Sequence, residues 1–309
     1  MNQIVLGTRG SALALAQAEL ARVALQRAFP ALEVKQQVFL TRGDQKLDLS
    51  LIRASEAGGK GLFTRELEEA LLTGAIDVAV HSLKDLPGHN PDGLEVTAVL
   101  ERAPSADLLL SKEAPGLDAL PPESRVGTSS VRRSRQLQWH RPDLVIEEWR
   151  GNVPTRLRKL GERDDVAVIV LAQAGLERLS YRAQDGILEL APWRFHVASL
   201  EELLLPAIGQ GAIALQSRAD RPEVTAVLRA IDHAPTHLAI RAERELQKLL
   251  AGDCSLPVGV RTVLLGPSLK MAAILFAPEG GAPHYAEAEG SADAPEEVAA
   301  RVFSMLQGQ

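Results

Sequence analysis

The sequence predicts an α/β protein: two parallel α/β domains followed by a smaller α+β domain. Short apolar runs alternate with amphipathic helical patterns through the first two thirds of the chain, which is typical of parallel sheets with helical connections. Hydrophobic residues make up 46% of the 309 residues and charged residues 24%, as in globular proteins. A chain of this length is expected to form two or three domains, each with its own core.

The first domain is predicted from an alternation of strand and helix patterns. Its long helix follows Ser11, a residue type that caps helices, and stops at Pro30. The expected elements are, in order, a strand at 4–6, a helix at 12–29, a strand at 34–40, a long polar loop at 41–61, a helix at 63–72 and a strand at 76–80.

The second domain is expected to begin after residues 103–122, where the composition turns to Pro, Ser, Asp and Gly. A second change from one domain to the next is predicted near 193–202, and the third domain follows. The expected elements of these two domains are strands at 125–127, 144–149 and 166–171, helices at 153–160 and from Gln173, and then a helix at 237–250, strands at 258–265 and 270–276 and a final helix at 294–306.

Several classes of protein are disfavoured by the composition. The longest charge-free run, 203–217, is 15 residues long and contains Pro206, whereas a membrane span needs about 20 apolar residues. No secretion signal is recognisable at the N-terminus. The single cysteine, Cys254, cannot close an intrachain disulfide. We therefore expect a cytoplasmic protein that does not interact with membranes.

The charge distribution points to an anionic partner. The net charge is −6, yet residues 125–163 contain ten Lys or Arg against four Asp or Glu. Arginine predominates, and its planar guanidinium suits carboxylates and phosphates. Nucleic acid is disfavoured because only Trp139 and Trp149 supply aromatic rings in this segment. An RNA-binding protein stays open as an alternative, which predicts a steep loss of binding with salt.

Two turns of similar sequence sit between a strand and a helix in the two α/β domains. They are Gly7–Ser11 and Gly127–Ser130. Helix N-termini present unpaired N–H groups, so two such turns facing one cleft form an anion site. Ordinary N-capping is the alternative for each turn. Arg9 in the first turn and the pair Arg132–Arg133 after the second favour the anion site.

Common nucleotide and metal motifs are absent from the sequence. A Walker-type loop fails around Lys60, because Ala54 and Gly61 stand where the pattern needs Gly and Ser or Thr. No dinucleotide fingerprint and no zinc spacing occur, so no metal site is expected. His81 at a strand end is predicted to be a structural histidine. Cys254, in a glycine-flanked turn, is either a small buried hydrophobe or a reactive thiol.

Nine segments, two of which contain the turns described above, match one family. They are Gly7–Ser11, Thr41–Asp44, Gly58–Phe63, Val80–Pro87, Val126–Arg133, Arg150–Val153 with Thr155–Leu157, Ala174–Leu179, Pro206–Gly211 and Gly252–Gly259. In these segments the chain resembles the porphobilinogen deaminase (hydroxymethylbilane synthase) family, and the segments follow the family's order.

The resemblance implies a transferase of tetrapyrrole (haem, porphyrin) biosynthesis. Members link four porphobilinogen molecules head to tail, release ammonia and yield hydroxymethylbilane. It also implies three domains, of which the first two resemble the periplasmic-binding-protein type II fold and the third is a small α+β domain. The implied domain bounds are 1–102 plus 201–220, 103–200 and 221–309, with the chain crossing back into the first domain near 201–219.

The resemblance further implies the site residues. Asp85 is the catalytic residue, and Cys254 carries a dipyrromethane cofactor through a thioether. The cofactor-binding residues are Ser82, Lys84, Thr128, Ser129, Ser130, Arg132 and Arg133, and the substrate-binding residues are Arg9, Ser11, Gln17, Lys60, Arg150, Arg156 and Arg178. Glu56 departs from the family, which commonly has lysine there, and Arg53 or Lys46 is a possible substitute.

Porphobilinogen is the only partner implied, and we expect a monomer. The alternative from another class is a two-lobed anion-binding sensor or solute-binding module without catalysis, which shares the architecture. Such a module has no use for a cofactor on Cys254.

Overall fold

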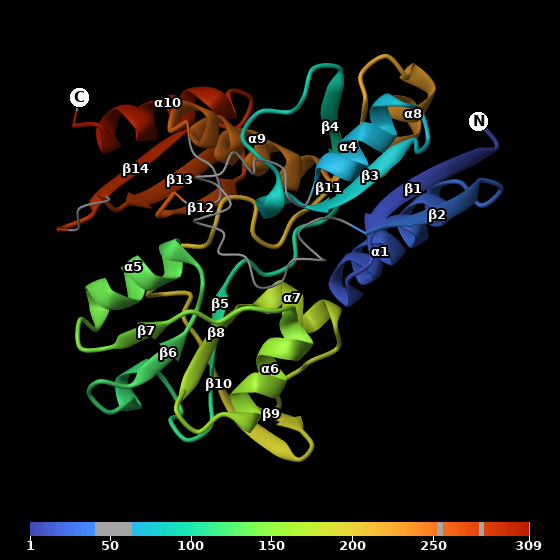
Figure 1. Cartoon of the computed structure of the whole chain (residues 1–309). Helices are drawn as coiled ribbons and strands as arrows, with labels where there is room; N and C mark the ends of the chain where they lie inside the picture. Colours follow the sequence, from blue (N-terminus) through green and yellow to red (C-terminus); the bar gives the residue numbers. More distant parts are fainter. Residues whose placement is uncertain (41–63, 252–255, 278–280, 309) are drawn as a thin grey trace.

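The computed structural model describes residues 1–40, 64–251, 256–277 and 281–308. Three sheets form its framework, each covered by helices (Figure 1). The predicted loop 41–61, Lys60 and Cys254 lie outside these residues. No helix of the described part is long and apolar enough to span a membrane.

The first sheet has the order β2-β1-β3-β11-β4, and its first three strands are parallel. Strand β11 runs antiparallel to both of its neighbours. Helices α1 and α8 bury apolar side chains against one face, and α4 covers the other. The elements are β1 (Gln3–Arg9), α1 (Ala12–Ala28), β2 (Glu33–Phe39), α4 (Arg65–Leu72), β3 (Val78–Ser82), β4 (Leu94–Val99), β11 (Ile213–Arg218) and α8 (Pro222–Arg229).

The second sheet has the order β7-β6-β8-β5-β10-β9, with β6, β7 and β8 parallel. Helix α5 covers one face, and α6 and α7 cover the other around the buried Trp149 and Phe195. The elements are β5 (Asp107–Ser111), β6 (Arg125–Gly127), α5 (Val131–His140), β7 (Val145–Glu147), α6 (Val153–Glu162), β8 (Val168–Ala172), α7 (Gln173–Arg178), β9 (Ile187–Leu190) and β10 (Trp193–Ser199).

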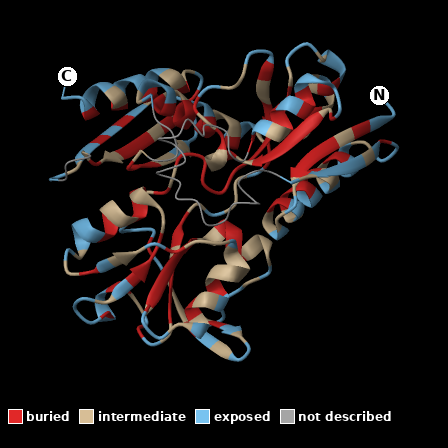
Figure 2. Cartoon of the chain, viewed as in Figure 1, coloured by how far each residue is buried: buried red, intermediate tan, exposed pale blue. Residues whose placement is uncertain are grey.

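The third sheet is an antiparallel meander, β12-β13-β14, with two helices on one face. Its core joins small and aliphatic residues from the sheet to α9 and α10. The elements are α9 (Ala234–Leu249), β12 (Val258–Leu265), β13 (Ser268–Leu275), β14 (His284–Ser291) and α10 (Pro295–Leu306). Figure 2 shows that burial is concentrated in inner strands such as β3, β8 and β11, whereas the edge strand β2 has no buried residue.

The predicted fold class is confirmed as two α/β domains and a small α+β domain. Side-chain caps set several helix starts, as expected for the helix after Ser11. Ser11, Ser130 and Asn152 accept backbone N–H groups at the starts of α1, α5 and α6. Helix α9 begins earlier than predicted because His233 caps it. Part of the predicted switch at 193–202 is instead strand β10.

Two segments connect the α/β domains. Residues 100–106 lead from β4 to β5, and 200–212 lead from β10 back to β11. The two segments are joined where the N–H of Ala103 donates to the carbonyl of Gly211, at 3.1 Å. From α9, the fully buried carboxylate of Glu243 binds both: it accepts from Arg102 at 2.6 and 3.1 Å and from the N–H of Gly209 at 2.7 Å.

The boundary between the first and third domains stays a prediction. Helix α8 lies beyond residue 221, yet its Val224 and Leu228 are buried in the core of the first sheet. We propose that the boundary falls after α8, near Ile231.

Gly211 gives a testable prediction about these connections. Its φ is +88°, and an added Cβ would lie 2.3 Å from the carbonyl oxygen of Ala103. Gly211→Ala is expected to lower the free energy of unfolding by more than about 1 kcal/mol, because both backbone strain and a backbone clash oppose it. Urea denaturation measures the loss. Gly266→Ala is the control: φ is +61° there but no atom lies within 4 Å, so an equal loss would contradict the clash.

Candidate active site

The predicted site residues lie at the carboxyl ends of parallel strands, where α/β sheets bind ligands. Arg9 ends β1, and Ser82 ends β3. Lys84 and Asp85 follow in the short 3-10 turn η1 (Leu83–Asp85). In the second domain, Thr128 directly follows β6. The strands of both domains therefore deliver polar side chains to the same end of their sheets.

Five predicted residues of the first domain line one cavity of about 60 Å³: Arg9, Ser11, Gln17, Ser82 and Asp85. The amide of Gln17 donates to the Ser82 hydroxyl at 2.8 Å and accepts from it at 3.0 Å. Nη1 of Arg9 lies 3.6 Å from Oδ2 of Asp85, and both side chains keep some exposure, 19% and 34%. Asp85 is thus held beside a cation and remains accessible.

His81 lies behind this cavity as a structural residue. It is buried, and its Nε2 lies 3.2 Å from Oε1 of Gln216. Burial lowers the pKa of the imidazole to about 4, and the nearby charges of Arg9 and Arg244 favour the same direction. His81 is therefore neutral at physiological pH, in agreement with the structural role predicted for it.

Arg132 and Arg133 converge on a buried carboxylate, Asp107. Nη2 of Arg132 lies 2.7 Å from its Oδ2, and Arg133 donates to its Oδ1 at 2.7 and 3.1 Å. Gln210 adds a further bond at 2.9 Å. Burial alone favours the neutral acid, yet the two guanidinium groups outweigh it and hold the pKa of Asp107 well below its usual range. Nε of Arg132 is buried and has no hydrogen-bond partner among the described residues.

Lys84 lies in the same electrostatic environment. Burial lowers the pKa of its ammonium to about 8, and the charges of Arg133 and Arg132 add to this effect. The carboxylates of Asp85 and Asp107 oppose it without balancing it. An added anion next to Lys84 is therefore electrostatically favoured.

Two further arginines of the second domain extend this positive region. Burial lowers the pKa of Arg156 to about 10, and the charges of Arg133 and Arg150 contribute. Nε of Arg156 donates to the carbonyl of Gly151 at 2.7 Å, which fixes the guanidinium at the start of α6. Arg150 is paired with the exposed carboxylate of Glu148.

Arg178 lies where the domains connect. Its Nη2 donates to the carbonyl of Gly211 at 2.6 Å. Burial lowers the pKa of Arg178 to about 10. This predicted substrate residue is therefore anchored to the returning segment of the chain.

The hydroxyls of the second turn make local hydrogen bonds. Thr128 Oγ1 accepts from the N–H of Ser130, and Ser129 Oγ accepts from that of Trp149. Ser130 Oγ caps α5 by accepting from the N–H of Arg133, at 3.4 Å. Ordinary N-capping, one of the two alternatives predicted for these turns, is therefore present at both Ser11 and Ser130.

Sequence reasoning missed Asp107 and Gln210, which hold the arginine pair. The only signal was a lone carboxylate at the start of an apolar run, Asp107–Leu110. Lys60 and Cys254 lie outside the described residues, so the structure does not place them. Within the described ranges, no group of three or more His, Cys, Asp or Glu side chains is arranged to hold a metal ion.

Comparisons with known proteins identify the family. Residues 4–226 match the family model described as "Porphobilinogen deaminase, dipyromethane cofactor binding domain", and residues 237–308 match "Porphobilinogen deaminase, C-terminal domain". The porphobilinogen deaminase of Desulforudis audaxviator is 42% identical, over 99% of this chain and 96% of that protein. That of Ralstonia nicotianae is 44% identical, over 96% and 85%.

A solved structure, the periplasmic aliphatic sulphonate binding protein SsuA from Escherichia coli, matches 81% of this chain and 71% of its own at 12% identity. The TM-score of this match is 0.41. The family models, by contrast, cover nearly the whole chain, and the relatives align over nearly their full length. The chain therefore belongs to the porphobilinogen deaminase family.

Proposed function

We propose that the chain joins four porphobilinogen molecules head to tail, with release of ammonia, and that the residues described above perform the reaction. Porphobilinogen, which carries carboxylate side chains, is the substrate of this family, and the product is hydroxymethylbilane. The family match does not favour a sensor or solute-binding module without catalysis.

One observation supports this proposal most: an excess of positive charge at the carboxyl ends of the strands. Lys84, Arg132, Arg133, Arg150 and Arg156 influence one another electrostatically. Asp85 and Asp107 lie among them and Glu148 pairs with Arg150, so three carboxylates oppose five cations. A chain of rings that carries several carboxylates supplies the missing negative charge, and bidentate arginine contacts orient it.

The same residues fit a dipyrromethane cofactor. Lys84 has a lowered pKa that an anion would relieve, and Nε of Arg132 is buried without a partner among the described residues. We assign the cofactor carboxylates to Lys84, Arg132 and Arg133, with Ser82 and the Thr128–Ser130 turn beside them, and its covalent attachment to Cys254. When bound, the cofactor supplies the pyrrole carbon to which the first substrate ring is joined.

Asp85 is the residue we assign to chemistry. When ammonia leaves porphobilinogen, the pyrrole nitrogen of the substrate bears developing positive charge, which an adjacent carboxylate stabilises. The same carboxylate can accept the proton that is lost after carbon–carbon bond formation. Arg9, at 3.6 Å, positions the Asp85 side chain. Ser11, Gln17, Lys60, Arg150, Arg156 and Arg178 are assigned to the substrate and the growing chain.

Intact-protein mass spectrometry tests the assignment of the cofactor. Purified wild-type protein is expected to be heavier than its sequence mass by two linked pyrroles. Cys254→Ser is expected to have the mass of its sequence alone and no activity, because a hydroxyl is a far weaker nucleophile than a thiolate. An unmodified and fully active wild type would contradict the proposal.

Lys84 gives a prediction in the cofactor-free Cys254→Ser protein. Folding lowers the pKa of Lys84 from 10.5 to about 8, so between these values the unfolded chain binds more protons than the folded one. Stability is therefore expected to rise with pH over this interval. Adding Lys84→Met should remove that rise, as measured by urea denaturation at pH 8 and pH 10. An unchanged rise in the double variant would assign it to other groups.

We also propose that the protein acts as a monomer in the cytoplasm. Each of the three domains has its own core within one chain. The only cysteine is assigned to the cofactor, so disulfides make no contribution to stability. Sedimentation of the purified protein tests the monomer.

A further inference from the structure

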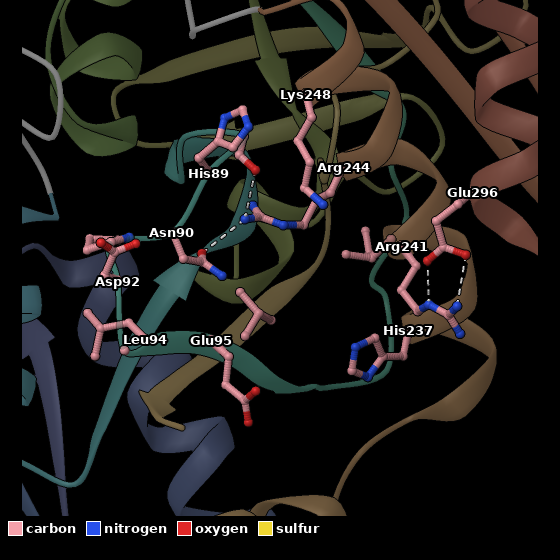
Figure 3. Close-up of a pocket in the computed structure, with 15 residues that line it drawn as sticks. His89, Asn90, Asp92, Leu94, Glu95, His237, Arg241, Arg244, Lys248 and Glu296 are labelled. Atoms are coloured by element: carbon pink, nitrogen blue, oxygen red, sulfur yellow. Dashed lines mark hydrogen bonds and ion pairs between the residues drawn. The ribbon is translucent and has the colours of Figure 1, made fainter. Parts of the chain in front are cut away.

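A second cavity lies outside the candidate active site. It has a volume of about 470 Å³ and lies between the loop at 88–93, the start of β4, helix α9 and the first turn of α10 (Figure 3). One wall thus belongs to the first domain and the other to the third. The volume lies within the range of sites for small organic molecules.

Arg244 on α9 is the unusual residue of this cavity. Only 8% of it is exposed, and burial lowers the pKa of its guanidinium. Its Nη2 donates to Oδ1 of Asn90 at 3.0 Å and, at 3.4 Å, to the carbonyl of Gly88. Its Nη1 is buried without a hydrogen-bond partner in the described part of the chain, and no carboxylate there forms an ion pair with it. A buried cation without a counterion is costly.

The other cations of the cavity differ from Arg244. Arg241 is neutralised by Glu296 through two hydrogen bonds of 2.8 Å each, as Figure 3 shows. Lys248 lies one turn after Arg244 on the same face of α9 and is exposed, with Glu245 3.1 Å from its ammonium. Arg241 and Lys248 each have a carboxylate nearby, whereas Arg244 has none among the described residues, and Lys248 lies beside Arg244 at the same end of the cavity.

The remaining lining limits what this end can bind. Leu94, Val96 and Ile240 supply apolar surface. Asp92 and Glu95 lie on the side of the loop and β4, where they oppose a second negative charge. An inorganic phosphate would leave most of the volume empty and make no use of the apolar surface. A molecule with one carboxylate and an apolar body would use both the cationic end and the apolar surface of the cavity.

We propose that this cavity binds a small organic carboxylate, with its carboxylate at Arg244 and Lys248 and its apolar body against Leu94 and Ile240. The loop at 88–93, which lines this cavity, begins only three residues after Asp85. The side chain of Gln247 on α9 also donates to the carbonyl of Leu86. A ligand here would contact both the first and the third domain, on a loop that follows the residue assigned to chemistry in the sequence. It therefore acts at a second site, separate from the cavity lined by Arg9 and Asp85.

Calorimetric titration of the full-length, cofactor-loaded protein with benzoate tests the site. We expect binding to wild type in the millimolar range. Arg244→Gln should weaken it roughly tenfold to a hundredfold, the effect of losing a charge-assisted hydrogen bond. Lys248→Gln changes an exposed residue and should weaken binding several-fold, so the test holds even if Arg244→Gln folds poorly.

Two variants are controls with matched chemistry. Arg241→Gln removes a pocket arginine that already has its carboxylate, and Arg9→Gln removes an arginine of the candidate active site. Both are expected to bind benzoate with nearly the wild-type affinity. The proposal is overturned if wild type does not bind benzoate, if Arg244→Gln and Lys248→Gln bind it unchanged, if Arg9→Gln abolishes binding, or if phosphate binds equally well with the same dependence on Arg244. Ammonia release, measured separately, tests Asp85 independently of these outcomes.

Discussion

Asp85→Asn is expected to slow ammonia release from porphobilinogen by at least a hundredfold to about a thousandfold, the scale of losing a principal electrostatic group in an active site. The substitution keeps the shape of the side chain and removes its charge. The amide can neither stabilise the developing positive charge nor accept the proton. Because the Asp85 side chain is 34% exposed and its ion pair with Arg9 is long, at 3.6 Å, folding and cofactor attachment should be retained. Single-turnover release of ammonia, together with the intact mass, measures both effects.

A matched carboxylate distinguishes chemistry from net charge. Asp220 is 66% exposed and pairs with Arg218, far along the chain from the site. Asp220→Asn makes the same change of charge and should leave turnover unchanged. If Asp85→Asn turned over at nearly the normal rate, the assignment of Asp85 would be wrong even though the family is established.

Arg133→Leu is expected to lower the free energy of unfolding by about 3–5 kcal/mol and to yield protein without cofactor. The first effect follows because Asp107 is fully buried, so removing one partner leaves part of a buried charge uncompensated. The carbonyl of Val170 also loses its donor at 2.9 Å. The second effect follows because Arg133 is assigned to the cofactor carboxylates. Urea denaturation and intact mass measure the two effects.

The pH dependence of the free energy of unfolding also distinguishes this variant from wild type. In wild type, the folded state lowers the pKa of Asp107, so its contribution is fully present above the ordinary aspartate pKa and is lost as the pH falls below it. Arg133→Leu raises this pKa and should reduce the loss of stability on acidification. Arg158→Leu is the control, since its pair with Glu162 is exposed on both sides and should contribute less than about 1 kcal/mol. Equal losses in both variants would contradict a special role for the buried pair.

The sequence predicted those parts of the fold that have local signals. Ser11 was predicted to cap a helix because its short polar side chain can satisfy a free N–H group, and in the structure it accepts from the N–H of Ala14. Strand β11 was missed because it lies in a continuous apolar run with no alternation, which periodicity cannot distinguish from other buried segments. Its antiparallel pairing with β3 depends on residues more than a hundred positions away in sequence.

Sequence motifs likewise predicted only part of the candidate site. Motifs located Arg9, Ser82 and Asp85, and the structure brings them to one cavity. The partner of the arginine pair was not foreseen, because Asp107 is 26 positions from Arg133 and meets it only after the second sheet has formed. Arg244 carried no signal either, since an arginine on an amphipathic helix is normally exposed, and only packing against the loop at 88–93 buries it.

The carboxylate of Glu243 has a mechanical consequence. It comes from the third domain, yet it holds both segments that connect the other two, through Arg102 and Gly209. Hinge closure in two-domain proteins concentrates rotation in such connecting segments. Helix α9 also contacts the first domain, through Arg244 and Gln247. Rotation of the two lobes about the connecting segments would therefore have to be accommodated around one buried carboxylate, so that Glu243 couples helix α9 to the relative orientation of the lobes.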